Sequence, residues 1–465
     1  MNTVHTSGPM RAGRREFLRR ASFIAASAGS PFALNLLALG SASAQTGGGH
    51  KALVCVFLAG GNDQSNTVVP MGTAEWNAYA QARPTLAIPR AQLLALNPLE
   101  YSEAPLGLHG SLNALKPLFD QQRVALLANV GTLAAPITKA QWNRGNATVP
   151  TPAQLFSHSD QQGAWQTGLP DRPSETGWLG RTGDLLASAF NPGSGVSIAM
   201  SVAGNNIMQA GNSTIQYQLT TQGAVKVSAV TFGLYGSAAG GTAARRLMSD
   251  TRQTLLENEL VKVSSRSINT ESLVSNALAS TPALTAFPDT SIGKQLAMVA
   301  RMIAARGALA QQRQIFFVQQ GGYDFHDNLQ NDQAARLKEL GDALAAFYQA
   351  TVSLGVQDNV TTFTASDFGR ALQSNGRGSD HGWGGHHFIM GGSVQGNRVY
   401  GSFPQTALGA DQDAGQGRLI PTTSVDEYAA TLATWLGVSN SNLPDVLPNL
   451  GRFAAPNLGF MRNLV

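Results

Sequence analysis

Residues 361–388, TTFTASDFGRALQSNGRGSDHGWGGHHF, decide the fold because they join a strand to a loop of polar side chains. The first of these residues, together with Val360, are β-branched or aromatic and predict a strand. The strand ends at Ser366 and Asp367, and a glycine-rich loop follows. An open α/β sheet places its ligand site at the carboxyl ends of strands. The stretch therefore predicts an α/β fold with a site at one edge of its sheet.

The loop after this strand is rich in histidine. It carries Asp380, His381, His386 and His387, so three of the eight histidines of the chain lie within seven residues. Carboxylate oxygen and neutral imidazole together suit a divalent cation such as Zn²⁺, Mn²⁺ or Mg²⁺. We expect that the adjacent His386 and His387 do not both point inward. The alternative is a polar surface loop whose histidines are only solvated.

Other predicted strands end in turns that carry aspartate. Residues 52–58, ALVCVFL, form an apolar run typical of a parallel strand buried on both faces, and Asp63 lies just after it. Residues 314–318 predict a strand that runs into Asp324 and His326. Parallel strands place their carboxyl ends at one edge, where converging carboxylates repel one another unless a cation joins them. We therefore predict a metal site formed by Asp63, Asp324, His326, Asp367 and His381.

Each of these three aspartates has a structural alternative. Asp63 in the sequence GGND and Asp324 in the sequence GGYD would also suit an Asx turn. Asp367 would also suit the cap of a helix that begins near Gly369.

The tetrapeptide at residues 157–160, SHSD, is ambiguous in the same way. Ser159 with Gln162 predicts a capping box at the start of a helix. A hydroxyl at a helix start is also where an anionic ester would dock and where a metal would activate a nucleophile. Ser157 and His158 are therefore candidate catalytic residues.

Strands and helices alternate along the rest of the chain. Two further strands are predicted at residues 124–130 and within 197–209, and residues 212–226 predict hairpins or a lid. Helical periodicity marks residues 111–121, 243–264, 294–312, 333–351 and a segment after Ser424, which begins with a capping box. The alternation predicts one large α/β domain, residues 45–465, with a mostly parallel sheet covered by helices on both faces.

The first 44 residues form a predicted export signal. Arg14 and Arg15 begin a twin-arginine motif, a weakly apolar stretch follows, and residues 42–44 suit signal cleavage. These features predict a periplasmic or secreted protein with no permanent membrane span. Without the five arginines and one glutamate of this segment, 27 basic and 27 acidic residues remain, so no net positive charge indicates nucleic-acid binding. A single cysteine, Cys55, excludes an intramolecular disulfide.

These motifs resemble those of known proteins. FTASDFG, ALVCVFLAGGND, FSHSDQQGAWQTGLP and GGYDFH are similar to the metal-ligand and nucleophile segments of the alkaline phosphatase and sulfatase superfamily. The set RREFLRR, GGND, SHSDQQGAWQTG, GWLGR, GGYDFHDN, SDFGR, DHGWGGHHFIMGG and PTTSVDEYAATLATWLG more closely resembles the DUF1501 family, exported bacterial proteins allied to that superfamily. The resemblance extends from residue 52 to about residue 437.

The resemblance implies an alkaline-phosphatase-like three-layer sandwich that holds one or two divalent ions, Zn, Mn, Mg or Ca. It implies the same five metal ligands and a nucleophile at Ser157, His158 or Ser159. Two positions differ from the superfamily, because Phe368 replaces an expected histidine and only Phe325 separates Asp324 from His326. No Cys-x-Pro-x-Arg sequence occurs, so a formylglycine nucleophile is not expected.

Two functions compete at this point. The first is an exported metal-dependent hydrolase of phosphate or sulfate esters, with Arg370 clamping the anion and a small anionic ester or a sulfated or phosphorylated glycan as substrate. The second is a non-catalytic periplasmic or surface protein that binds a polysaccharide or a partner protein on a degenerate hydrolase scaffold. Phe368 favours the second function, and the five candidate ligands favour the first.

Overall fold

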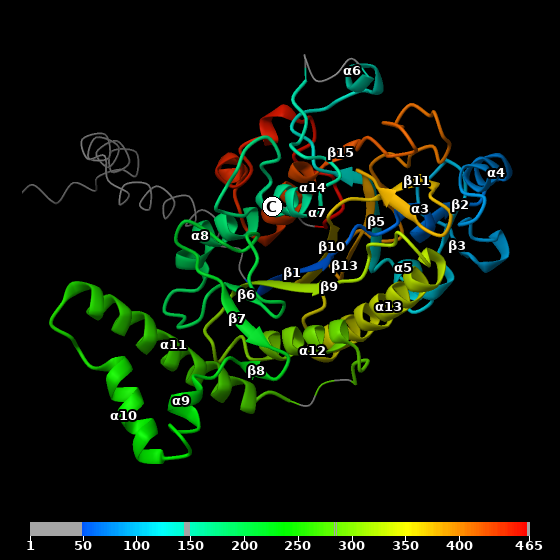
Figure 1. Cartoon of the computed structure of the whole chain (residues 1–465). Coiled ribbons are helices and arrows are strands. Elements are labelled where there is room, and N and C mark those ends of the chain that lie inside the picture. The colour runs from blue at the N-terminus through cyan, green and yellow to red at the C-terminus, as the bar shows by residue number, and fades with distance from the viewer. Residues whose placement is uncertain (1–48, 144–148, 283, 285, 463–465) are drawn as a thin grey trace, which may run out of the picture. The chain divides into compact units, whose positions relative to one another are not determined.

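A central sheet organises the structure, a computed structural model that describes residues 49–143, 149–282, 284 and 286–462 (Figure 1). The predicted export signal lies outside these described residues. The order of strands is β14–β5–β13–β10–β1–β9–β6–β7–β8, and β15 also pairs with β5. The strands are β1 (Lys51–Leu58), β5 (Val124–Gly131), β6 (Ala199–Ser201), β7 (Tyr217–Thr220), β8 (Gly223–Ala224), β9 (Arg313–Gln320), β10 (Val360–Ser366), β13 (Gly385–Gly391), β14 (Val399–Tyr400) and β15 (Thr423–Ser424).

The three central strands are parallel and end in register. Leu58 at the end of β1 lies opposite both Gln320 of β9 and Ser366 of β10. The loops that carry Asp63, Asp324 and Asp367 therefore leave the sheet at the same edge, as predicted. Strand β13 runs in the opposite direction, because it pairs antiparallel with β10 and β5. Its first residue, Gly385, consequently starts at this edge and anchors the histidine-rich loop there.

Helices cover both faces of the sheet (Figure 1). One face carries α5 (Lys116–Asp120), α12 (Ser291–Ala304) and α13 (Leu329–Ser353), and the other carries α7 (His158–Thr167), α8 (Trp178–Phe190), α14 (Val425–Leu436) and α15 (Leu443–Val446). Val54 and Val56 of β1 join the first apolar core, and Cys55 and Phe57 join the second. The predicted three-layer α/β fold with a mostly parallel sheet is confirmed. The described residues all belong to the compact unit Gly48–Val465, and none of their helices is long and apolar enough to cross a membrane.

Two short sheets flank the site edge. Strand β11 (Arg370–Ser374) pairs antiparallel with β12 (Ser379–His381), so Arg370 lies opposite His381. This hairpin returns the chain to the edge and places His381 there. The alternative in which Asp367 caps a helix near Gly369 is therefore wrong, because the strand β11 follows Asp367. A second small sheet consists of β2 (Val68–Pro70), β4 (Leu106–Leu108) and β3 (Leu94–Leu96).

Several helices differ from their predicted bounds. The helix expected at residues 243–264 is two helices, α10 (Ala238–Ser249) and α11 (Leu255–Ala279), because Thr254 caps a new helix by accepting from the Glu257 amide. Residues 111–121 contain a 3₁₀ turn, Gly110–Leu112, before the short α5. The hairpin predicted within residues 212–226 is confirmed as β7–β8. The remaining short helices are α3 (Gln64–Thr67), α4 (Thr73–Ala82), α6 (Lys139–Asn143) and α9 (Ser228–Thr231).

Candidate metal centre

Four side chains meet at the carboxyl edge of the sheet. The Oδ1 atom of Asp324 lies 3.0 Å from Nε2 of His326, 3.3 Å from Nε2 of His381 and 3.4 Å from Nε2 of His158. The ligating atoms of His158, Asp324 and His381 all lie within 4.8 Å of one another. The structure thus brings together three of the predicted metal ligands and adds His158, which the sequence presented as a catalytic candidate.

His158 and His381 are both held with a nitrogen lone pair toward the carboxylate of Asp324. His158 Nδ1 lies 2.7 Å from Oδ2 of Asp367, a carboxylate oxygen that accepts, so Nδ1 carries the proton. His381 Nδ1 donates to the carbonyl of Phe156 at 2.6 Å. In the neutral form of each ring, Nε2 is therefore unprotonated and faces Asp324. This is how outer partners orient metal-ligating histidines.

The residues present fit a divalent cation. His158 Nε2 is buried and makes no hydrogen bond, which is costly unless another group occupies that position. Two imidazole nitrogens and one carboxylate oxygen form a common N/O ligand set for Zn²⁺ and its neighbours. The Asp324 side chain is 47% exposed, so solvent reaches the cluster from one side. Open coordination of this kind is typical of catalytic rather than structural metal sites.

Burial and neighbouring charges shift the pKa values of the cluster residues in different directions. The hydrogen bond to Asp367 raises the pKa of His158, against the effect of its partial burial. Burial lowers the pKa of His381, and His158 and Arg370 reinforce the effect. Burial alone would raise the pKa of Asp324, but the hydrogen bond and charge of Arg370 outweigh it and hold the pKa below its usual value. Asp324 is consequently ionised at neutral pH and available to a cation.

Asp367, a predicted ligand, lies behind His158 rather than inside the cluster. It is buried, and its oxygens accept from His158, from Gln162 Nε2 at 2.9 Å and from the Gly60 amide at 3.1 Å. Gly60 has φ +117°, and a Cβ there would lie 2.6 Å from the Asp324 amide nitrogen. Only glycine lets these two strand-end loops approach so closely. Asp367 therefore orients His158 and joins two loops of the site.

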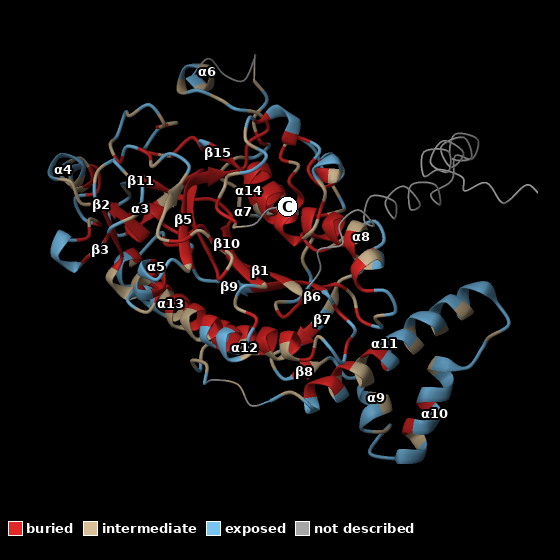
Figure 2. Cartoon of the chain, turned by 180° about the vertical axis from the view of Figure 1, so that it is seen from behind, coloured by how far each residue is buried: buried red, intermediate tan, exposed pale blue. Residues whose placement is uncertain are grey.

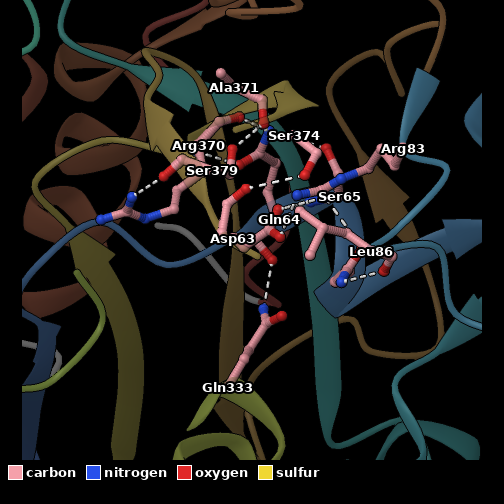
Figure 3. A network of polar contacts seen from close by, with 12 residues as sticks. Asp63, Gln64, Ser65, Arg83, Leu86, Gln333, Arg370, Ala371, Ser374 and Ser379 are labelled. Carbon is pink, nitrogen blue, oxygen red and sulfur yellow. Dashed lines mark hydrogen bonds and ion pairs between the residues drawn. The ribbon is translucent and has the colours of Figure 1, made fainter. Parts of the chain in front are cut away.

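Asp63, also a predicted ligand, is not brought into the cluster. Its two oxygens accept from Arg83 at 2.7 and 2.8 Å, and both side chains are fully buried (Figure 3). Its Oδ1 also caps the short helix α3 through the Ser65 amide. Figure 3 shows Gln333 reaching the same segment, where it donates to the Asp63 carbonyl at 2.7 Å. Asp63 thus anchors the first strand-end loop, and the predicted Asx-type turn is present.

Arg370, predicted as an anion clamp, is buried and already engaged. Its Nε donates to the carbonyl of Gly61 at 3.0 Å, and its terminal nitrogens donate to the carbonyls of Gly60 and Ser379 and to Asp324. The Gln64 side chain donates to the Arg370 carbonyl and accepts from the Arg370 amide (Figure 3). Arg370 therefore ties three loops together and positions Asp324. Its guanidinium does not face solvent as a free clamp would.

Phe368, which directly follows Asp367, packs against the cluster. Its ring centroid lies 4.9 Å from that of His158 and 4.7 Å from that of His381. The ring supports both imidazoles from one side but offers no ligand atom.

Helix α7 begins one residue after Ser157, so the predicted capping box is wrong. Ser159 lies inside the first turn, and Gln162 donates to Asp367 instead of to the helix start. Ser157 Oγ donates to Asp160 Oδ2 at 2.6 Å. The local sequence instead uses the helix start to direct His158 toward the cluster.

His386 and His387 are both buried in β13, away from the cluster. His386 Nδ1 accepts from the Asn129 amide at 3.0 Å, and the His387 ring centroid lies 4.9 Å from that of Trp165. Burial lowers the pKa of each to about 3, so both are neutral. The two side chains lie on opposite faces of the sheet, because adjacent residues of a strand alternate in direction, so the expectation that they do not both point inward holds.

Sequence reasoning did not single out several residues around the cluster. The Phe156 carbonyl fixes His381, and Phe156 has φ +75°, an unusual conformation for a bulky residue. The Arg418 guanidinium carbon lies 4.8 Å from the Phe156 ring centroid, and its Nε donates to the His381 carbonyl at 2.9 Å. Asp380 Oδ1 lies 3.6 Å from Nδ1 of His326. Of these residues, only Asp380 could be identified from the sequence, because it lies beside His381 in the histidine-rich loop.

Comparisons with solved structures give low-identity resemblances. A sulfatase from Pseudoalteromonas sp., PsFucS1, has 11% identity over 96% of this chain and 77% of its own, with a TM-score of 0.35. A 2-O GAG sulfatase has 10% identity over 84% of this chain and 71% of its own, with a TM-score of 0.30. A mutant of the alkaline phosphatase PafA has 13% identity over 69% of this chain and 63% of its own, with a TM-score of 0.21. Because these TM-scores are below 0.5, the proposals below use only the residues of this chain.

The sequence comparisons identify the family. No curated protein matches the chain. The profile described as "Protein of unknown function (DUF1501)" matches residues 50–442, which include every described member of the cluster. The chain therefore belongs to the DUF1501 family.

Proposed function

We propose that the chain is a metal-dependent hydrolase of phosphate or sulfate esters. The observation that carries this proposal is the convergence of two histidine lone pairs on an ionised, solvent-accessible carboxylate, with one of those nitrogens buried and unpartnered. His158, Asp324 and His381 would hold one divalent cation. Such an ion polarises an ester oxygen and activates a nucleophile at neutral pH.

His326 is the proposed proton carrier. Its Nε2 lies 3.0 Å from Oδ1 of Asp324 and 2.9 Å from Nε2 of His381. Its side chain is 45% exposed, and Asp380 lies behind Nδ1. A histidine between a carboxylate and solvent is suited to give a proton to a departing alcohol and to take one from water.

Arg418 replaces Arg370 as the proposed anion clamp. The hydrogen bond from its Nε to the His381 carbonyl and the stacking of its guanidinium on Phe156 fix the side chain beside the cluster. Its terminal nitrogens make no hydrogen bond to any residue that the structure describes. Those nitrogens are thus available for two parallel bonds to a phosphate or sulfate group. The proposed substrates are a small anionic ester or a sulfated or phosphorylated glycan.

Ser157 is the proposed nucleophile, because it directly precedes His158 and donates to Asp160, a carboxylate able to receive its proton. The test is hydrolysis of an aryl phosphate and an aryl sulfate by the purified protein with added Zn²⁺ or Mn²⁺. Ser157→Ala should abolish turnover while metal content is retained, whereas the matched variant Ser159→Ala should remain active. Full activity of Ser157→Ala would assign the attack to water.

A non-catalytic glycan-binding protein is the second candidate. The internal engagement of Arg370 and of the Ser157 hydroxyl favours it, since neither group is free in this structure. Metal-dependent binding of sulfated glycan without cleavage of either aryl ester would support this function over the first.

We also propose export through the twin-arginine pathway. The motif at Arg14 and Arg15 supports it. Replacing both with lysine should leave the precursor in the cytoplasm, and undiminished delivery of that variant to the periplasm would refute the proposal.

A further inference from the structure

Helix α11 carries an apolar stripe, which we define as Leu256, Leu260, Val263, Ser267, Thr270, Val274 and Ala277. These positions alternate at spacings of four and three residues, the heptad pattern that keeps one face of a helix toward a partner. The second half of the stripe is already packed, because Thr270, Val274 and Ala277 are buried against the body of the protein.

The first half of the same stripe is exposed. Leu256 is 82% exposed, Leu260 66% and Val263 57%. Figure 2 shows this end of α11 extending away from the sheet with α10 beside it, both largely exposed. Three large apolar side chains in one helical line form a surface that soluble proteins normally cover. The stripe therefore extends beyond the part of α11 that packs against the body, and its exposed half offers a packing surface for a second helix.

We propose that this surface binds a second copy of the chain, through antiparallel pairing of the two α11 helices about a twofold axis. In this register Leu260 lies opposite the partner's Val263, and Leu256 lies opposite the partner's Ser267. Residues 255–267, none of which is buried, extend about 20 Å at roughly 1.5 Å per residue. The overlap ends where residue 268 becomes buried against the body, so the free length of one arm matches that of the other.

The charges that flank the stripe favour this partner and this direction. Glu259 and Arg266 are both exposed, lie seven residues apart and occupy the same edge of the stripe. Antiparallel pairing places each Glu259 beside the partner's Arg266, which gives two symmetric ion pairs. Parallel pairing would instead place Glu259 beside the partner's Ser264. The surface is thus self-complementary in charge as well as in its apolar positions, as a twofold interface requires.

Sedimentation velocity of the full chain over a concentration series tests the proposal. The wild type should sediment as a monomer–dimer equilibrium. Leu260→Glu should abolish the dimer, because it places a charge at the centre of the apolar stripe. Leu247→Glu is the matched control, since Leu247 is 69% exposed on α10 but lies outside the stripe, and it should dimerise like the wild type.

Charge exchange provides the sharper test. Glu259→Lys and Arg266→Glu should each lose the dimer, because each creates two like-charge contacts, and their equimolar mixture should regain a heterodimer. The mixture rules out simple unfolding of the arm, since both variants must keep the helix to pair. A monomeric wild type, a dimer unaffected by Leu260→Glu, or variants that bind anionic lipid vesicles but never each other would overturn the proposal.

Discussion

Removal of the Asp63 carboxylate should destabilise the fold strongly without removing the metal. In Asp63→Ala, the fully buried Arg83 would keep one acceptor, Asn66 Oδ1 at 3.0 Å, and its Nε already has no partner. Breaking a buried pair by removing one charge typically costs about 3–5 kcal/mol. A domain has only about 5–15 kcal/mol of stability, so the variant should unfold at a much lower urea concentration.

The double variant Asp63→Leu/Arg83→Leu is the matched control. Replacing both partners of a buried ion pair with apolar groups is often close to neutral, although the lost helix cap costs about 1 kcal/mol. Its urea midpoint should therefore lie near that of the wild type. Folded Asp63→Ala should also bind as much metal per chain as the wild type. A loss below about 1 kcal/mol combined with loss of the ion would refute this reasoning and return Asp63 to the metal site.

Three further results are expected. Asp367→Asn should weaken metal affinity by about 10–100-fold while the ligands stay in place, measured by competition with a chromophoric chelator. Gly61→Ala should lower the melting temperature, because a Cβ there would lie 2.4 Å from the Phe368 ring at φ +81°. Burial raises the pKa of Asp426 from 3.8 to about 8, and neither of its oxygens has a hydrogen-bond partner. Between those values the unfolded state binds fewer protons, so stability falls by up to about 1.4 kcal/mol per pH unit as pH rises. Asp426→Asn should lack that slope in urea midpoints compared across this range.

The edge of the sheet at which the site lies was predictable, because the direction of the parallel strands alone determines where their carboxyl ends meet. An apolar run identified β1, β-branched and aromatic residues identified β10, and a further predicted strand corresponds to β9; the turns after them located Asp324 near the histidine-rich loop. No comparable rule predicts which residue, distant in the sequence, a polar side chain contacts in the fold. Arg83 lies at the carboxyl end of α4 with nothing in its sequence to mark Asp63 as its partner. Its charge nevertheless determines what Asp63 does.

The role of His158 was missed for a similar reason. Asp367, which sets the ring's orientation, lies 209 residues away in the sequence. The break between α10 and α11, in contrast, had a readable signal. Thr254 and Glu257 have the spacing of a capping box, and the Thr254 hydroxyl bonds the Glu257 carboxylate at 2.8 Å. Periodicity across residues 243–264 outweighed that signal in the prediction.

The metal content of the purified protein tests the central claim most directly. Elemental analysis after gel filtration, with Zn²⁺ or Mn²⁺ supplied during growth, should find about one divalent ion per wild-type chain. Asp324→Ala and His381→Ala should lose the ion, whereas Ser159→Ala, which leaves the cluster intact, should keep it. A metal-free wild type that also fails to bind added cation, or an ion retained in full by both cluster variants, would contradict the account.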